Sequence, residues 1–131
     1  MTAVLWDSWA FIESALDGPR SLDVEALLDG AEGVVTTHHV VAETFTYLSR
    51  EARSSRPAVA WWNDLRESRV RVIETSLEDI HAFASALKQV GTLSFVDLSL
   101  GTTAKTLGVR AVATADREFR RMRLDPLFAK P

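Results

Sequence analysis

Two acidic residues stand where short apolar runs of the chain stop. Asp7 follows the run of residues 3–6, and Asp116 comes shortly after the run that ends at residue 113. Such runs are typical of buried strands, so both acids lie at or just beyond strand ends. Ligands of an open parallel sheet bind beyond the carboxyl ends of its strands. A carboxylate there also caps helices or begins turns, but two of them favour a functional site.

A third acid, Glu43, lies within a predicted helix. Helical spacing places it on an apolar stripe with Val40 and Tyr47. A charged group on such a stripe is unfavourable unless something pairs with it. The pairing group is either a ligand of the site or a salt-bridge partner, for which Arg50 is the nearest base.

A fourth acid, Asp97, stands three residues after Ser94. This is the spacing of a capping box, so helix capping is one interpretation. The same helix face carries Leu100, Gly101 and Ala104, which points the carboxylate inward rather than toward solvent. Small residues on that face let the helix pack closely against a sheet.

Four carboxylates directed at one edge of a sheet repel one another strongly, and divalent cations are the natural compensation. Ligation by oxygen alone selects hard ions, so Mg²⁺ or Mn²⁺ fits better than zinc. Two such ions, about 3.5–4 Å apart, stabilise the attacking and the leaving oxygen of an in-line displacement at phosphorus. The acids therefore predict metal-assisted hydrolysis of a phosphate ester.

Strand and helix patterns alternate along the whole chain, which favours an α/β fold. We expect a three-layer sandwich in which helices flank a mainly parallel sheet of four to five strands. The 131 residues match one domain, and no linker or repeat divides residues 1–131. Predicted strands cover residues 3–6, 33–36, 70–73 and 109–113, and predicted helices cover 9–16, 21–29, 37–53, a segment from 57, 76–91 and 94–108.

The net charge of −3 argues at first against a polyanionic partner, but the charge is unevenly distributed. Residues 1–49 hold eight acids and one base, whereas residues 50–131 hold fourteen bases and ten acids. The chain has no cysteine, which suits a reducing cytoplasm. Its apolar runs are too short for a membrane span. We expect a cytoplasmic protein with no membrane partner.

Four short segments, taken in order, resemble the PIN-domain family. They are VLWDS at residues 4–8, VVAE at 40–43, LSFVD at 93–97 and ATADREF at 113–119. The chain is most similar to the VapC-type toxins of bacterial and archaeal toxin–antitoxin pairs. Each segment alone is a weak signal, but four in this order and spacing are specific.

The resemblance implies a metal-dependent endoribonuclease that cleaves RNA by attack of water and leaves a 5′-phosphate. It also implies a cognate antitoxin of a type II pair and a homodimer. By position, the catalytic and metal-binding residues are Asp7, Glu43, Asp97 and Asp116, with Asp7 and Asp97 as the central ligands of Mg²⁺ or Mn²⁺.

Three further residues match supporting positions of the family. Glu118 lies where many relatives have another acid, and we expect it to hold a water in the outer shell of the metal. Ser8 and Thr114 match hydroxyls beside the first and last acids, which would orient a water or a phosphate oxygen. A hydroxyl at a strand end also serves simply as a helix cap.

Arginines follow the last acid closely, and Arg117, Arg120 and Arg121 are the candidates for binding RNA. The same group could instead dock an acidic stretch of the antitoxin. His38 and His39, one turn before Glu43, are either metal or proton-transfer groups or, as we favour, surface residues at a helix start.

Trp61 and Trp62 could stack on bases, but neighbours in a helix point to different sides, so at least one is expected in the core or a dimer interface. Three other functions compete with a ribonuclease. A non-catalytic RNA-binding or scaffold module would keep the fold without turnover. A nuclease for structured DNA would need a longer insertion, and a receiver domain would need a lysine after its last strand.

Overall fold

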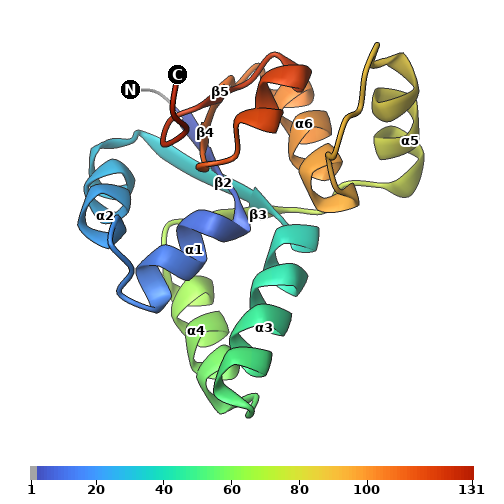
Figure 1. Cartoon of the computed structure of the whole chain (residues 1–131). Coiled ribbons are helices and arrows are strands. Elements are labelled where there is room, and N and C mark those ends of the chain that lie inside the picture. The colour runs from blue at the N-terminus through green and yellow to red at the C-terminus, as the bar shows by residue number, and fades with distance from the viewer. Residues whose placement is uncertain (1–2) are drawn as a thin grey trace.

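The computed structural model describes residues 3–131 as a five-stranded, all-parallel sheet flanked by helices (Figure 1). This confirms the α/β fold that the sequence predicts. The strands follow the order β3-β2-β1-β4-β5. They are β1 (Ala3–Trp6), β2 (Gly33–Thr37), β3 (Arg71–Ile73), β4 (Ala111–Ala113) and β5 (Asp125–Pro126).

Six α-helices and one 3₁₀ helix are assigned within the described residues. In Figure 1, α3 and α4 form a hairpin that extends from the bottom of the sheet, while α5 and α6 stand on its right. The helices are α1 (Ser8–Ala15), α2 (Ser21–Gly30), α3 (His38–Ala52), α4 (Arg56–Glu67), α5 (Leu77–Ala86), α6 (Phe95–Leu107) and the 3₁₀ helix η1 (Arg117–Met122).

The central strand β1 is buried on both faces, as its uninterrupted apolar run requires. Val4, Leu5 and Trp6 have almost no exposed surface. Burial of three large side chains in one short strand contributes several kcal/mol, at ~1.5–3 kcal/mol each. This packing holds the strand end, and with it Asp7, in a single position.

The register of the sheet aligns the ends of its two central strands. Trp6 of β1 pairs with Ala113 of β4. The next residues, Asp7 and Thr114, therefore leave the sheet side by side. A parallel sheet places all such strand ends at one edge, and this edge is where the predicted acids were expected.

The predicted helix over residues 76–91 is wrong in its last five residues, because α5 stops at Ala86. Gly91 lies in the following loop with a φ of +53°, a left-handed conformation that suits glycine. A Cβ there would lie 2.4 Å from Nε of Arg121 and 2.6 Å from Oε1 of Glu118. The glycine therefore allows a close approach of the loop to η1 instead of ending a helix.

The two neighbouring tryptophans face different environments, which confirms that at least one belongs to the core. Trp61 is partly buried and packs edge-to-face on Phe11, with 5.6 Å between the ring centroids. Trp62 remains 46% exposed. In the part of the chain that the structure describes, no helix is both long and apolar enough to cross a membrane.

Candidate metal centre

Asp7 is the most buried of the four candidate acids, with 6% of its surface exposed. Its Oδ1 accepts a hydrogen bond from the backbone N–H of Ser8 at 2.8 Å, so the side chain caps α1. Its Oδ2 accepts a hydrogen bond from the Thr114 hydroxyl at 2.7 Å. Both carboxylate oxygens are thereby oriented by the ends of two neighbouring strands.

The hydroxyl of Ser8 connects the first two acids. It donates a hydrogen bond to Oε1 of Glu43 and lies 3.4 Å from Oδ1 of Asp7. The alternative partner of Glu43, Arg50, forms no ion pair in the described chain. The predicted apolar stripe is wrong at one position, because Tyr47 is 43% exposed, whereas Val40 is buried.

The reason lies in the angle at which α3 packs. The buried positions of this helix are Val40, Thr44 and Leu48, a strict spacing of four residues. Glu43 lies beside this line and is only partly buried. It therefore reaches the edge of the sheet, where Ser8 lies, instead of the core.

Asp97 both caps a helix and directs its carboxylate inward, the two interpretations that its spacing allowed. Its Oδ2 accepts from the backbone N–H of Ser94 at 2.9 Å, and its own N–H donates to the Ser94 hydroxyl at 3.1 Å. This confirms the capping box at the start of α6. The residue is nevertheless 9% exposed, so the carboxylate is also directed inward.

Asp116 occupies the corresponding place at the start of η1. Its Oδ1 accepts from the backbone N–H of Glu118 at 2.9 Å. Its own N–H donates to the Thr114 hydroxyl at 3.2 Å. Because that hydroxyl also donates to Asp7, Thr114 connects the first acid to the fourth.

The four acids influence one another electrostatically. Burial, followed by the charges of Asp97 and Glu43, raises the pKa of Asp7 to about 7, although the Thr114 hydrogen bond opposes the shift. Burial also raises the pKa of Asp97, and the charges of Asp116 and Glu43 add to the increase. Over residues 3–131 none of the four forms an ion pair with a base, so their negative charge is uncompensated.

The donor set fits a hard divalent cation, because it consists of carboxylate and hydroxyl oxygens beside uncompensated charge. As the side chains lie, however, no three acidic or histidine groups of the described chain are close enough together to hold one ion. The hydrogen bond between Ser8 and Glu43 occupies a carboxylate oxygen of the site. A metal ligand role for Glu43 therefore requires that this contact be exchanged for the ion.

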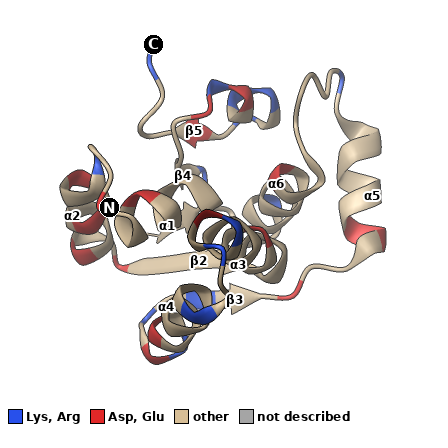
Figure 2. Cartoon of the chain, turned by 60° about the horizontal axis from the view of Figure 1, so that its bottom comes forward, with Lys and Arg blue, Asp and Glu red and all other residues tan. Residues whose placement is uncertain are grey.

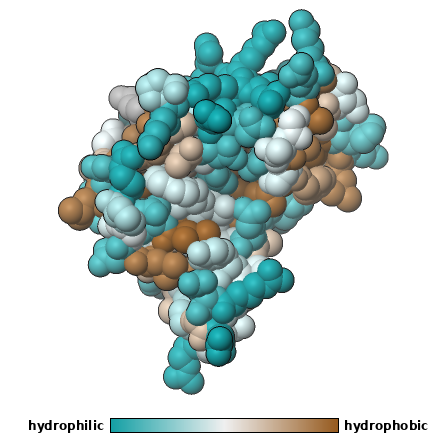
Figure 3. All heavy atoms as spheres, viewed as in Figure 1, coloured by the Kyte–Doolittle hydropathy of each residue, from teal (hydrophilic) through white to brown (hydrophobic). Residues whose placement is uncertain are grey.

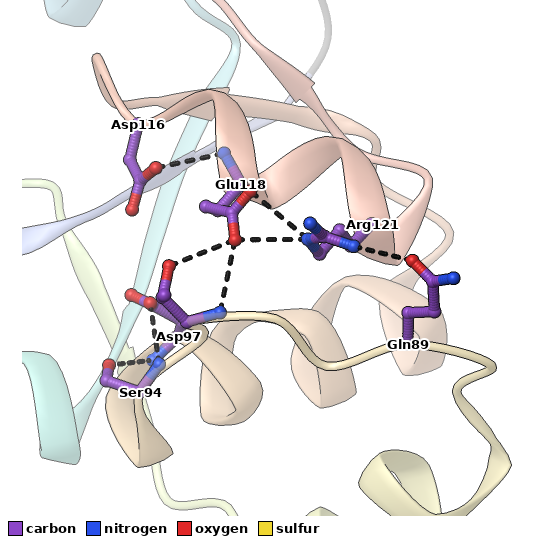
Figure 4. A network of polar contacts seen from close by, with 7 residues as sticks. Gln89, Ser94, Asp97, Asp116, Glu118 and Arg121 are labelled. Carbon is purple, nitrogen blue, oxygen red and sulfur yellow. Dashed lines mark hydrogen bonds and ion pairs between the residues drawn. The ribbon is translucent and has the colours of Figure 1, made fainter.

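Glu118 lies near Asp97 and Asp116, but its carboxylate is directed toward Thr92 and Arg121 (Figure 4). Its Oε1 accepts from the backbone N–H of Thr92 at 3.1 Å, from the Thr92 hydroxyl at 3.0 Å and from Nε of Arg121 at 3.0 Å. Arg121 in turn donates to Gln89 at 2.9 Å. We call Thr92, Gln89, Glu118 and Arg121 the Glu118 network.

The Glu118 network joins the loop before α6 to η1, and therefore the element that carries Asp97 to the element that carries Asp116. The sequence analysis did not identify Thr92 or Gln89, because nothing in their spacing distinguishes them from ordinary loop residues. The nearby Gly91 was the available signal. The expected role of Glu118 in holding a metal-bound water stays a prediction, and it competes with these hydrogen bonds.

The remaining candidates lie around this edge. Nδ1 of His38 lies 3.3 Å from the carbonyl of Ile73, and Nε2 of His39 lies 3.4 Å from the carbonyl of Thr75, as suits residues at a helix start. Arg120 donates to the carbonyl of Lys130 at 3.0 Å. Arg117 is exposed, as are Arg120 and Arg121.

Residues 4–124 match the sequence profile of the PIN domain. The chain belongs to the PIN domain family. The matched residues include all four candidate acids and every helix of the structure from α1 to η1. No curated protein sequence matches this PIN domain closely.

Solved structures of low sequence identity share the fold. VapC20 of Mycobacterium tuberculosis, described as a toxin that cleaves the sarcin–ricin loop, has 20% identity and a TM-score of 0.81 over 95% of this chain and 98% of its own. VapBC2 of Rickettsia felis, bound to a promoter DNA fragment, has 17% identity and a TM-score of 0.66 over 93% of each chain. FitAB bound to DNA has 20% identity and a TM-score of 0.63 over 95% and 93%.

The raised pKa of Asp7 predicts a pH-dependent stability in buffer containing a chelator. Between pH 4 and 7 the folded state retains a proton that the unfolded state has lost, so stability falls as the pH rises. Asp7→Asn removes this penalty and should stabilise the protein at pH 8 by up to about 4 kcal/mol, with little gain at pH 4. Urea unfolding at both pH values measures the difference.

The exposed Asp29 of α2 provides the control, since Asp29→Asn should change stability equally little at both pH values. An equal effect of Asp7→Asn at pH 4 and pH 8 would contradict the proposed cost of the Asp7 charge.

The Glu118 network predicts that Glu118→Ala frees the loop of residues 87–94. Loss of the acceptor of the Thr92 N–H should speed amide hydrogen exchange of that loop at least tenfold, while the interior of α6 stays protected. Exchange followed by mass spectrometry measures this. The exposed Glu51 at the end of α3 gives the matched control Glu51→Ala, and unchanged exchange in Glu118→Ala would contradict the joining role.

Proposed function

We propose that this PIN domain is a metal-dependent endoribonuclease and the toxin of a type II toxin–antitoxin pair. The observation that supports it most is the set of four carboxylates, Asp7, Glu43, Asp97 and Asp116, which influence one another and form no ion pair with a base within residues 3–131. Such an arrangement is unfavourable by itself and becomes favourable when cations bind. Membership of the PIN family supports the same proposal, because the resemblance to VapC-type toxins implies a nuclease.

The proposed reaction is hydrolysis of an RNA phosphodiester. Water attacks phosphorus, the bond from phosphorus to the 3′ oxygen breaks, and the products carry a 5′-phosphate and a 3′-hydroxyl. When bound, Mg²⁺ or Mn²⁺ supplies Lewis-acid stabilisation of the charge on the phosphoryl oxygens and lowers the pKa of water. The acids would hold these ions, with Asp7 and Asp97 as the central ligands.

The chain's own residues hold these acids in place. The Thr114 hydroxyl donates to Oδ2 of Asp7 and accepts from the backbone N–H of Asp116, so it orients both residues. The capping box of Ser94 holds one oxygen of Asp97 and leaves the other available. Ser8, which bridges Asp7 and Glu43, would release its hydroxyl to a water or a phosphate oxygen when Glu43 turns to a cation.

The RNA strand is proposed to contact the arginines of η1, which begins directly after Asp116. Figure 2 shows basic residues on this helix and acidic residues gathered on α2. Of the three predicted arginines, Arg120 donates to the carbonyl of Lys130 and Arg121 to Glu118. Arg117 is exposed and forms no side-chain hydrogen bond within residues 3–131, which makes it the strongest candidate for a phosphate contact.

RNA as the substrate class also agrees with the description of VapC20 as a toxin that cleaves the sarcin–ricin loop. VapBC2 and FitAB are complexes, and this supports an antitoxin as a partner of the present chain. The other expected assembly is a homodimer, and light scattering of the purified protein tests it through the molar mass.

The proposed chemistry predicts that Asp97→Asn lowers RNA cleavage at least a hundredfold. Asparagine can still accept the hydrogen bond from the Ser94 N–H, so the helix cap and the fold should survive. Cleavage of total cellular RNA with Mg²⁺ or Mn²⁺, followed by sequencing of the 5′-phosphate ends, measures the activity and locates the cleavage sites. Removal of the ions with EDTA should abolish it.

Asp79→Asn is the matched control, because Asp79 stands in the same Ser-x-x-Asp spacing after Ser76 at the start of α5 but is exposed and outside the site. Full activity of purified Asp97→Asn would refute the assignment. If the wild type binds RNA but neither binds Mg²⁺ or Mn²⁺ in calorimetry nor cleaves, a non-catalytic RNA-binding module becomes the better interpretation.

Arg117→Ala is expected to weaken binding to all RNA sequences alike. It should also reduce the slope of log affinity against log salt concentration by about one, the contribution of one phosphate contact. Fluorescence anisotropy of a labelled RNA in the presence of Ca²⁺, at several salt concentrations, gives the slope. Arg66→Ala, an exposed arginine at the end of α4, should leave the slope unchanged. An equal loss in both variants would argue against a specific contact.

A further inference from the structure

A hollow lies between α5, α6 and η1. It has a volume of about 1030 Å³, at the upper end of typical ligand sites. Every ionisable residue that lines it is a base, in a chain whose net charge is −3. These bases are Lys88, Lys105, Arg110, Arg121 and Arg123. We call this hollow the basic cleft.

The floor of the basic cleft is apolar. Phe83 and Leu87 contribute from the α5 side, and Ala104 and Met122 from α6 and η1. Gly101 also belongs to this floor, and α6 packs closely on Met122 there, because a Cβ at Gly101 would lie 2.4 Å from the Met122 sulfur. Figure 3 shows hydrophobic atoms beside hydrophilic groups on the side of the molecule where α5 and α6 lie.

The charges around the rim are mostly uncompensated. Arg121 pairs with Glu118, but the other four bases form no ion pair with the described residues. All four are exposed. A rim of free bases around an apolar floor complements a ligand that carries apolar groups between negative charges.

We infer that the basic cleft binds an acidic amphipathic peptide segment of a partner protein. Apolar side chains of the segment would fill the floor, and its Asp and Glu side chains would pair with the rim, notably with Lys88, Lys105 and Arg110. This inference does not depend on the proposed ribonuclease activity. Of the rim residues only Arg121 belongs to the proposed RNA contacts, whereas Lys88, Lys105 and Arg110 belong neither to those contacts nor to the four acids.

Two features favour a peptide over an RNA strand. RNA bound as a single strand stacks its bases on aromatic side chains, and Phe83 is the one aromatic group among the lining residues. The cleft also extends away from the acids. Lys105 lies eight residues along α6 from Asp97, roughly 12 Å, and Arg110 precedes β4 at the opposite edge of the sheet.

A library of random 12-residue peptides displayed on phage tests the inference on the full chain. Enriched peptides should combine Asp and Glu with large apolar residues, and their binding should weaken with salt. A synthetic copy should shift the methyl NMR signal of Met122, one of two methionines in the chain. The variant Lys88→Glu/Lys105→Glu/Arg110→Glu should bind it at least tenfold more weakly.

The control variant Arg50→Glu/Arg56→Glu/Arg66→Glu makes the same charge change on exposed arginines of α3 and α4 and should bind normally. The neutral variant Lys88→Gln/Lys105→Gln/Arg110→Gln, with milder substitutions, should show an intermediate loss. Enrichment of neutral or basic peptides, or equal binding to wild type and the reversed variant, would overturn the inference. A shift of Met122 by single-stranded RNA and not by the enriched peptide would also overturn it, and would assign the cleft to nucleic acid.

Discussion

Negative charge gathered at one edge of a parallel sheet is the constraint on which the rest of this structure depends. The sheet buries β1 on both faces, and this brings Asp7 to the edge with almost no access to water. Asp97 and Glu43 are near enough to raise its pKa further. A folded chain that holds these acids together without a counter-charge sacrifices stability, and such a sacrifice is typical of a functional site.

The molecule limits this cost by giving three of the four acids a second, local partner. Asp7 caps α1, Asp97 caps α6 and Asp116 caps η1, so each accepts a backbone hydrogen bond at a helix start. A helix start favours negative charge, both through its free N–H groups and through the helix dipole. The same hydrogen bond also fixes the direction of the carboxylate, so the elements that stabilise the acids also orient them.

The candidate site and the basic cleft lie on two sides of the Glu118 network. Arg121 contributes to both, because it donates to Glu118 and lines the cleft. A chain of net charge −3 provides both acidic and basic surfaces because its acids and bases are separated. A group of its acids lies at the edge of the sheet and on α2, while a group of its bases lies on η1 and around the basic cleft. Partners of opposite charge can therefore bind to different parts of one small domain.

Local patterns in the chain were sufficient to predict the alternation of strands and helices, the parallel sheet and the capping box of Asp97, because these depend on neighbouring residues. They were insufficient for Glu43, whose partner Ser8 is 35 residues away, and for Tyr47, whose exposure depends on how α3 packs. The Glu118 network joins residues 26 positions apart, and the basic cleft needs two helices and η1 to meet. Such contacts arise only when the sheet register and the helix packing angles are set, since spacing along one element carries no information about the element opposite.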